Sequence, residues 1–110
     1  MARVTAPKEV EVGPYYYEVL MNATARIGLG SDFGDSDHDL LQIRINCDRS
    51  FQVQQEVMVH ETLHAALNVC ALDEMLGEDK SEDVVRRLAP VLTAILKKNP
   101  RWVAFVVAGK

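Results

Sequence analysis

Alternating hydrophobic and polar residues predict strands in two regions of the chain. In the first region, Val10 and Val12 alternate with glutamates, and residues 15–21 are rich in aromatic and β-branched side chains, which indicates two short strands. The alternative is a helix over residues 14–26, with proline at its first position and Gly28 past its end. The second region is a half-buried strand over residues 41–47, with Leu41, Ile43, Ile45 and Cys47 on one face and Gln42, Arg44 and Asn46 on the other.

Residues 57–72 carry apolar side chains on nearly all sides, which predicts a central, buried helix. Asp48 or Ser50 is suited to cap its start, and Gly77 is suited to stop it after about Leu76.

A second helix is expected over residues 82–97, after a cap at Ser81 and before Asn99-Pro100. Pro90 lies inside it and is expected to kink it. The apolar tail, residues 102–107, is expected to pack as a short strand or turn. The fold class predicted from these elements is α+β, a single domain over residues 1–110 with a small sheet packed on the central helix.

The segment between the strand regions, residues 28–39, reads as a loop with several aspartates. Asp35, Asp37 and Asp39 have the alternate spacing that begins a calcium-binding EF-hand loop. Leu40 and Asn46 stand where such a loop needs glycine and glutamate, so a solvated acidic turn is the better interpretation.

Composition and charge narrow the function classes. With 110 residues and a formal net charge of -4, the chain lacks the clustered basic residues that a nucleic-acid partner requires. Its apolar runs are too short to span a bilayer, and charged residues near the N-terminus break any signal peptide. We therefore expect a cytoplasmic protein without a membrane partner. Cys47 and Cys70 lack zinc-ligand spacing and are interpreted as small core residues.

The central helix contains the sequence His60-Glu61-Thr62-Leu63-His64, an HExxH motif. Residues four apart lie on one helix face, so the two histidines can bind one metal ion. Glu61 is rotated by about 100° from His60, where a general base for a metal-bound water would stand. Polar side chains in such a buried helix need partners, and a zinc ion would supply one.

A catalytic zinc ion needs a third protein ligand, and no further histidine follows in the helix. Glu82 borders the expected apolar stripe of the second helix, whereas Asp83 is rotated toward solvent. We therefore expect Glu82 to be the ligand, with Asp83, Asp79 and His38 as alternatives. The non-functional alternative for Glu82 is an ion pair with Arg86, four residues later. The apolar stripe consists of Val85, Leu88, Ala89, Leu92, Ile95 and Leu96.

Three segments together resemble a family of proteins: residues 41–46, residues 56–67 (EVMVHETLHAAL) and residues 81–100. They are similar to the minimal zincin-type metallopeptidases encoded by bacteriophages and prophages, and distantly to the SprT-like and ImmA/IrrE groups. The resemblance implies Zn²⁺ on His60, His64 and a glutamate of the second helix, which falls on Glu82, with Glu61 as general base.

The resemblance also implies hydrolysis of a peptide or protein substrate that adds antiparallel to an edge strand, here residues 42–46. A phage-encoded protein would act in the host cytoplasm. No clear oxyanion donor is evident, and the candidates are Tyr15, Tyr16, Tyr17, His38 and Arg86. One rival is a catalytically silent, zinc-stabilised structural or adaptor protein. The other is a metal-free interaction domain whose histidines are satisfied by Glu61 and Glu82.

Overall fold

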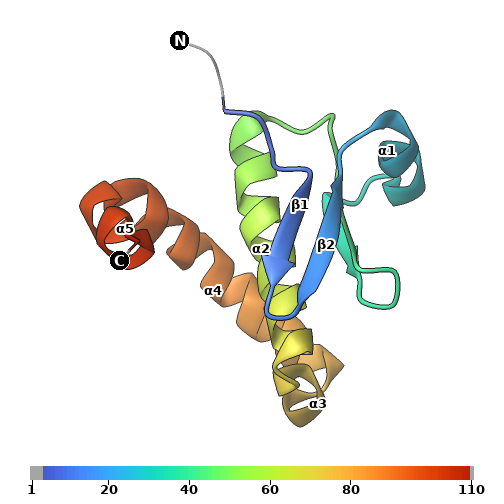
Figure 1. The fold of residues 1–110 in the computed structure, drawn as a ribbon. Coiled ribbons are helices and arrows are strands. Elements are labelled where there is room, and N and C mark those ends of the chain that lie inside the picture. The colour runs from blue at the N-terminus through green and yellow to red at the C-terminus, as the bar shows by residue number, and fades with distance from the viewer. Residues whose placement is uncertain (1–3, 110) are drawn as a thin grey trace.

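A four-stranded mixed sheet organises the fold in the computed structural model, which describes residues 4–109 (Figure 1). The strand order is β1-β2-β4-β3; β1 pairs antiparallel with β2, β2 parallel with β4, and β4 antiparallel with β3. The fold is α+β, as expected from the sequence. The strands are β1 (Glu9–Val12), β2 (Tyr15–Leu20), β3 (Gly34–Asp37) and β4 (Gln42–Ile45).

This strand order corrects the expected edge strand. β4 lies between β2 and β3, so the segment 42–46 has a neighbour on both sides. The free edges belong to β1 and β3. The interpretation of residues 28–39 as a loop is wrong in part, because β3 lies within it.

The first helix, α1 (Ala23–Leu29), follows the expected strand region and overlaps the expected loop at residues 28–29. The Asn22 side chain caps it by accepting a hydrogen bond from the Ala25 N–H at 2.8 Å, and Gly30 ends it with a φ of 61°. The alternative helix over residues 14–26 is wrong for its first half, since residues 15–20 pair as β2.

The HExxH helix, α2 (Phe51–Val69), begins at the expected Ser50 cap, whose hydroxyl accepts a hydrogen bond from the Val53 N–H at 3.3 Å. It ends earlier than expected, because Ala71 adopts a left-handed conformation with a φ of 63°. A short helix, α3 (Leu72–Leu76), follows before Gly77.

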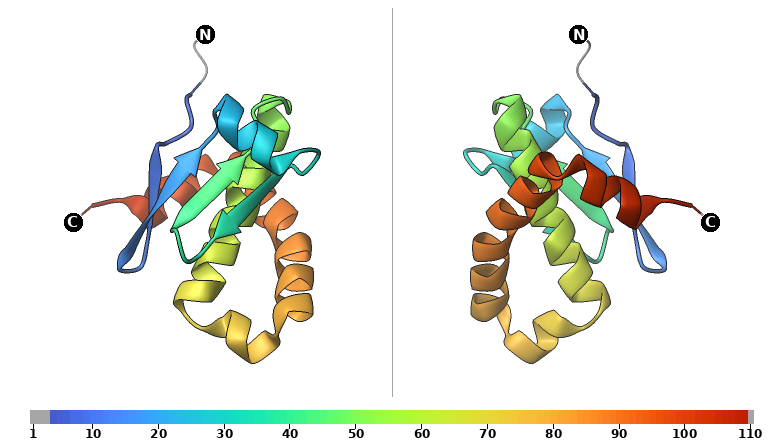
Figure 2. Two further views of the ribbon diagram at one scale, coloured as in Figure 1. Left: turned by 90° about the vertical axis from the view of Figure 1, so that its right-hand side faces the viewer. Right: turned by 90° about the vertical axis from the view of Figure 1, so that its left-hand side faces the viewer.

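The next helix, α4 (Glu78–Lys98), starts at Gly77, whose φ of 83° reverses the chain. The expected Ser81 cap is therefore wrong, since Ser81 lies inside the helix. Pro90 lies within α4 as expected. Figure 2 shows α2, α3 and α4 as a U-shaped run with α3 at its turn.

The apolar tail forms a helix, α5 (Pro100–Val107), and not the expected strand or turn. Proline at its first position suits a helix start, since that residue's missing N–H would have no partner in the helix.

The hydrophobic core lies between the sheet and α2 and contains Val12, Tyr17, Val19, Ile43, Ile45, Val57 and Ala65. The buried positions of α4 are Ser81, Val85, Ala89 and Thr93, a narrower stripe of smaller residues than expected. Leu88, Ile95 and Leu96 were expected in that stripe but are 46%, 38% and 38% exposed. The interpretation of Cys70 as a core residue is likewise wrong, because it is exposed.

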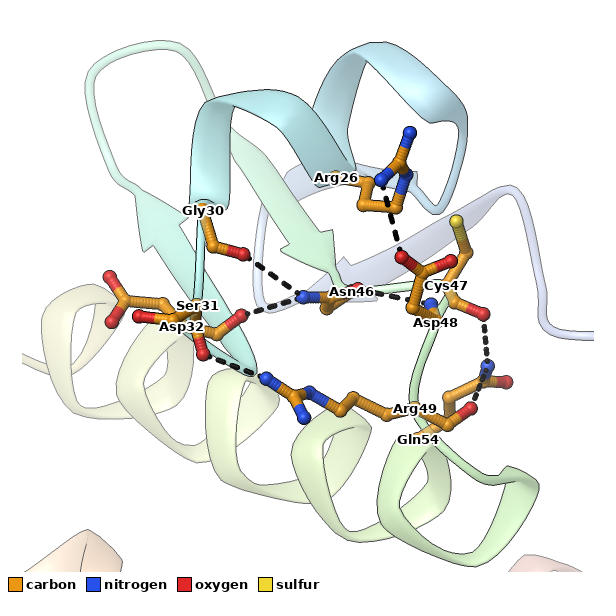
Figure 3. A network of polar contacts seen from close by, with 9 residues as sticks. All are labelled: Arg26, Gly30, Ser31, Asp32, Asn46, Cys47, Asp48, Arg49 and Gln54. Carbon is orange, nitrogen blue, oxygen red and sulfur yellow. Dashed lines mark hydrogen bonds and ion pairs between the residues drawn. The ribbon is translucent and has the colours of Figure 1, made fainter.

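Asn46 departs from the expected polar face of its strand, being 3% exposed. Its amide donates to the carbonyls of Asp32 at 3.1 Å and Gly30 at 3.4 Å, and its side-chain oxygen accepts from the Asp48 N–H at 3.0 Å (Figure 3). These bonds link the α1–β3 connection to the β4–α2 connection.

The aspartates considered for a calcium loop make contacts within β3, β4 and the turn between them. Arg44 of β4 forms an ion pair with Asp35 through two hydrogen bonds. Asp37 accepts hydrogen bonds from the N–H groups of Asp39 and Leu40 and closes the β3–β4 turn. Across residues 4–109, no helix is both long and apolar enough to cross a membrane.

Candidate metal centre

The orientation of α2 is set by three buried residues four positions apart, Val57, Glu61 and Ala65, which are 8%, 6% and 0% exposed. Val57 and Ala65 belong to the core beneath the sheet, so this face of α2 turns toward the sheet. His60 and His64 precede this row by one position and therefore lie on a flank of the helix. Both rings are half-buried, and their centroids are 4.9 Å apart.

Glu82 reaches these two histidines from α4. Its two carboxylate oxygens lie 3.4 Å from His60 Nε2 and 2.8 Å from His64 Nε2. One ligand atom from each of the three side chains lies within 4.8 Å of the others. The structure thus brings together the three residues that the sequence selected as metal ligands.

The donor set suits zinc. Two imidazole nitrogens and a carboxylate oxygen are ligands that zinc takes in proteins, and two ligand atoms on a tetrahedral zinc ion lie about 3.3 Å apart. The observed separations between Glu82 and the histidines bracket that value. Burial and the neighbouring His64 lower the pKa of His60, while Glu82 opposes the shift.

Glu61 lies beside this cluster under β3. Gly34 permits the approach, because a Cβ there would lie 2.5 Å from Val57 Cγ1 and 3.6 Å from Glu61 Cγ. The Ser36 side chain hydrogen-bonds to the Glu61 carboxyl, and burial raises the pKa of that carboxyl to about 7. Glu61 is thus a buried carboxyl held by the edge strand next to the cluster of His60, His64 and Glu82.

Asp83, one of the other candidates for the third ligand, is engaged elsewhere. Asp83 pairs with Arg86 at 2.6 Å and Arg87 at 3.1 Å on the outer face of α4, and these bonds lower its pKa. Exposure alone does not separate the two acids, since the side chains of Glu82 and Asp83 are 52% and 43% exposed. The two side chains differ in their partners: the Glu82 carboxylate contacts the two histidines, and the Asp83 carboxylate contacts Arg86 and Arg87. Arg86 pairs with Asp83, so the alternative ion pair with Glu82 is wrong.

His38 lies in the wall of the same pocket, with its Nδ1 3.0 Å from the hydroxyl of the buried Tyr17. Asp79 also lines the pocket. Within residues 4–109, neither belongs to the group whose ligand atoms converge.

The site opens into two pockets that share Gly34, His60 and Glu61. One, of about 670 Å³, extends past His64 to α3 and the start of α4. The other, of about 360 Å³, extends along α2 and α4 to Phe33 and Pro90. Together they form a groove with α2 as its floor and with β3 and α4 as its walls. Sequence reasoning missed Gly34, Ser36 and Ser81, which carry no motif and are placed only by the tertiary fold.

Comparisons of the chain with family models, with curated proteins and with solved structures give no match.

Proposed function

We propose that the chain is a zinc-dependent metallopeptidase. The observation that carries the proposal is the convergence of His60, His64 and Glu82 at the floor of an open groove, with Glu61 buried beside them. The resemblance of the HExxH segment to zincin-type metallopeptidases points to the same chemistry.

His60 and His64 of α2 and Glu82 of α4 would hold the zinc ion. When bound, zinc acts as a Lewis acid and lowers the pKa of coordinated water toward about 7. Because Glu82 arrives from a different helix than the histidines, the site depends on the packing of α4 against α2.

Glu61 is placed to move the proton. Its carboxylate accepts a proton from the attacking water as the water oxygen bonds to the peptide carbonyl carbon. The same carboxyl then gives the proton to the leaving amine nitrogen as the C–N bond breaks. Ser36 holds the Glu61 side chain, and β3 covers it, so little bulk water reaches the carboxyl.

The free edge of β3 provides a place for an extended peptide. It takes the role that the family resemblance implied for residues 42–46. β3 borders both pockets, so a peptide that pairs with this edge passes over the histidines and Glu61. Of the candidate oxyanion donors, His38 lines the larger pocket and Arg86 the smaller, while the three tyrosines line neither.

The deciding experiment compares wild type with Glu61→Gln, both purified without a histidine tag. We expect both to contain one zinc ion by mass spectrometry, and Glu61→Gln to cleave a mixture of peptides about 100-fold more slowly or worse. Glu9→Gln, on the opposite edge of the sheet, is the matched control and should match wild type. Protein without zinc, or equal cleavage by both, would contradict the proposal.

The alternative is a zinc-stabilised structural or adaptor protein. The observation that favours it is that the three candidate ligands link two helices, as a structural metal site does. In that case wild type would contain zinc and unfold more easily after His60→Ala, yet cleave no peptide.

A further inference from the structure

The walls of the larger pocket carry a strong excess of negative charge. Seven of its thirteen lining residues have carboxyl groups, and none is lysine or arginine. The corner between α3 and α4 supplies four of them, Asp73, Glu74, Glu78 and Asp79. Among residues 4–109 none of these four takes part in an ion pair, whereas Asp35 is neutralised by Arg44.

An unsatisfied polar group lies in the same pocket wall. Ser81 is 5% exposed, and its hydroxyl oxygen has no hydrogen-bond partner among the described residues. Leaving a buried hydroxyl unpaired costs about 1–3 kcal/mol. Ser81 lines the pocket one position before Glu82, so a ligand group that forms a hydrogen bond with this hydroxyl would remove that cost.

The smaller pocket has a different character. Its walls include Arg86 and five apolar or small residues beside its acids: Phe33, Val53, Val57, Ala89 and Pro90. The groove therefore changes along its length, from a carboxylate-lined end at the α3–α4 corner to a mixed, largely apolar end.

We propose that the carboxylate-lined end selects polypeptide substrates that place lysine or arginine side chains in it. This inference rests on the proposed peptidase function, since it names the substrate class of the same groove. Guanidinium and ammonium groups pair with carboxylates and donate several hydrogen bonds, whereas an acidic substrate would be repelled by the Glu78 and Asp79 side chains.

A binding experiment tests the selection without turnover. The probes are two labelled decapeptides, identical except that one carries two adjacent arginines and the other two citrullines, which keep the shape and lack the charge. Binding to Glu61→Gln protein in zinc chloride is followed by fluorescence anisotropy. We expect the arginine peptide to bind about 10-fold more tightly at low salt, and about 2-fold or less at 0.5 M salt, where exposed charges are screened.

Two double variants with equal net charge distinguish an effect of the pocket carboxylates from an effect of the overall charge of the protein. Glu74→Gln with Glu78→Gln should abolish the arginine preference. Glu9→Gln with Glu11→Gln, on the far edge strand β1, should keep it. Equal affinity for both peptides, or equal loss of preference in both double variants, would overturn the inference.

Cleavage assays with the wild-type protein distinguish a failure of this inference from a failure of the proposed peptidase function. Cleavage of both peptides at the same rate would leave the peptidase standing and refute the selection. An arginine preference in binding with cleavage of neither peptide would refute the peptidase and leave the charge selectivity of the pocket standing.

Discussion

At the scale of single residues, Asn46 connects three parts of the fold. Its side chain bonds to two carbonyls of the α1–β3 connection and to one N–H group before α2. Arg49 adds a parallel link, donating to the Ser31 carbonyl at 2.9 Å and lying over the Phe33 ring. Both residues thus hold β3 close to the helix that carries the histidines.

Asn46→Ala is expected to lower the free energy of unfolding by about 1–3 kcal/mol, because it removes three hydrogen bonds made by a side chain that is only 3% exposed. Denaturant unfolding followed by circular dichroism measures this. Asn99→Ala is the control, since Asn99 is exposed and its side-chain amide donates to the carbonyl of Ile95 in the preceding helix, α4. A loss below about 0.5 kcal/mol for Asn46→Ala, or an equal loss for both variants, would show that the network adds little.

At the scale of elements, the sequence predicted those with strong periodicity or clear caps. The half-buried strand became β4, and Ser50 caps α2 as expected. The HExxH spacing alone predicts that His60 and His64 share a face, and the packing of α2 against α4 completes the site with Glu82.

The missed elements have weaker local signals. β3 has the sequence GDSD, which shows no apolar alternation. The strand is held instead by its pairing with β4 and by the Asp35–Arg44 ion pair, which a local sequence pattern does not reveal. The α5 segment is rich in valine and aromatic residues, which favour strands, and a helix forms there after Pro100. α1 is limited by Asn22 and Gly30, whereas the helix considered from the sequence covered residues 14–26, with Gly28 past its end.

The contact between β3 and α2 depends on Gly34. Adding a Cβ there would bring it within 2.5 Å of Val57 Cγ1 and 2.8 Å of the Arg44 carbonyl oxygen. The Arg44 carbonyl belongs to β4 and cannot move independently of the sheet, so β3 must shift relative to both β4 and Val57 of α2. The displaced strand would carry Ser36 away from Glu61.

Gly34→Ala is therefore expected to lower the free energy of unfolding by about 1–3 kcal/mol and to slow peptide cleavage. Unfolding curves and cleavage assays on the same preparations give both values. Gly109→Ala is the matched control, because a Cβ at Gly109 meets nothing within 4 Å. Unchanged stability in Gly34→Ala would mean that Val57 and β3 adjust without cost.

At the scale of the whole molecule, α4 packs on α2 outside the core that lies beneath the sheet. The core beneath the sheet includes no residue of α4. The buried residues of α4 are Ser81, Val85, Ala89 and Thr93, which are small and bury little apolar surface. A zinc ion shared by α2 and α4 would therefore supply a large part of the docking energy of α4.

Zinc is accordingly expected to raise the free energy of unfolding by about 2.7 kcal/mol at a free concentration 100 times its Kd. Removing it with a chelator should increase amide hydrogen exchange in α4 far more than in α2 and β4, whose packing is independent of the metal. Glu82→Gln should reduce the zinc-dependent stabilisation, whereas Asp83→Asn, in the same turn but paired with Arg86 and Arg87, should keep it. Equal stabilisation of wild type and Glu82→Gln would exclude Glu82 as a ligand, and uniform exchange across all helices would show that the metal does not act through α4.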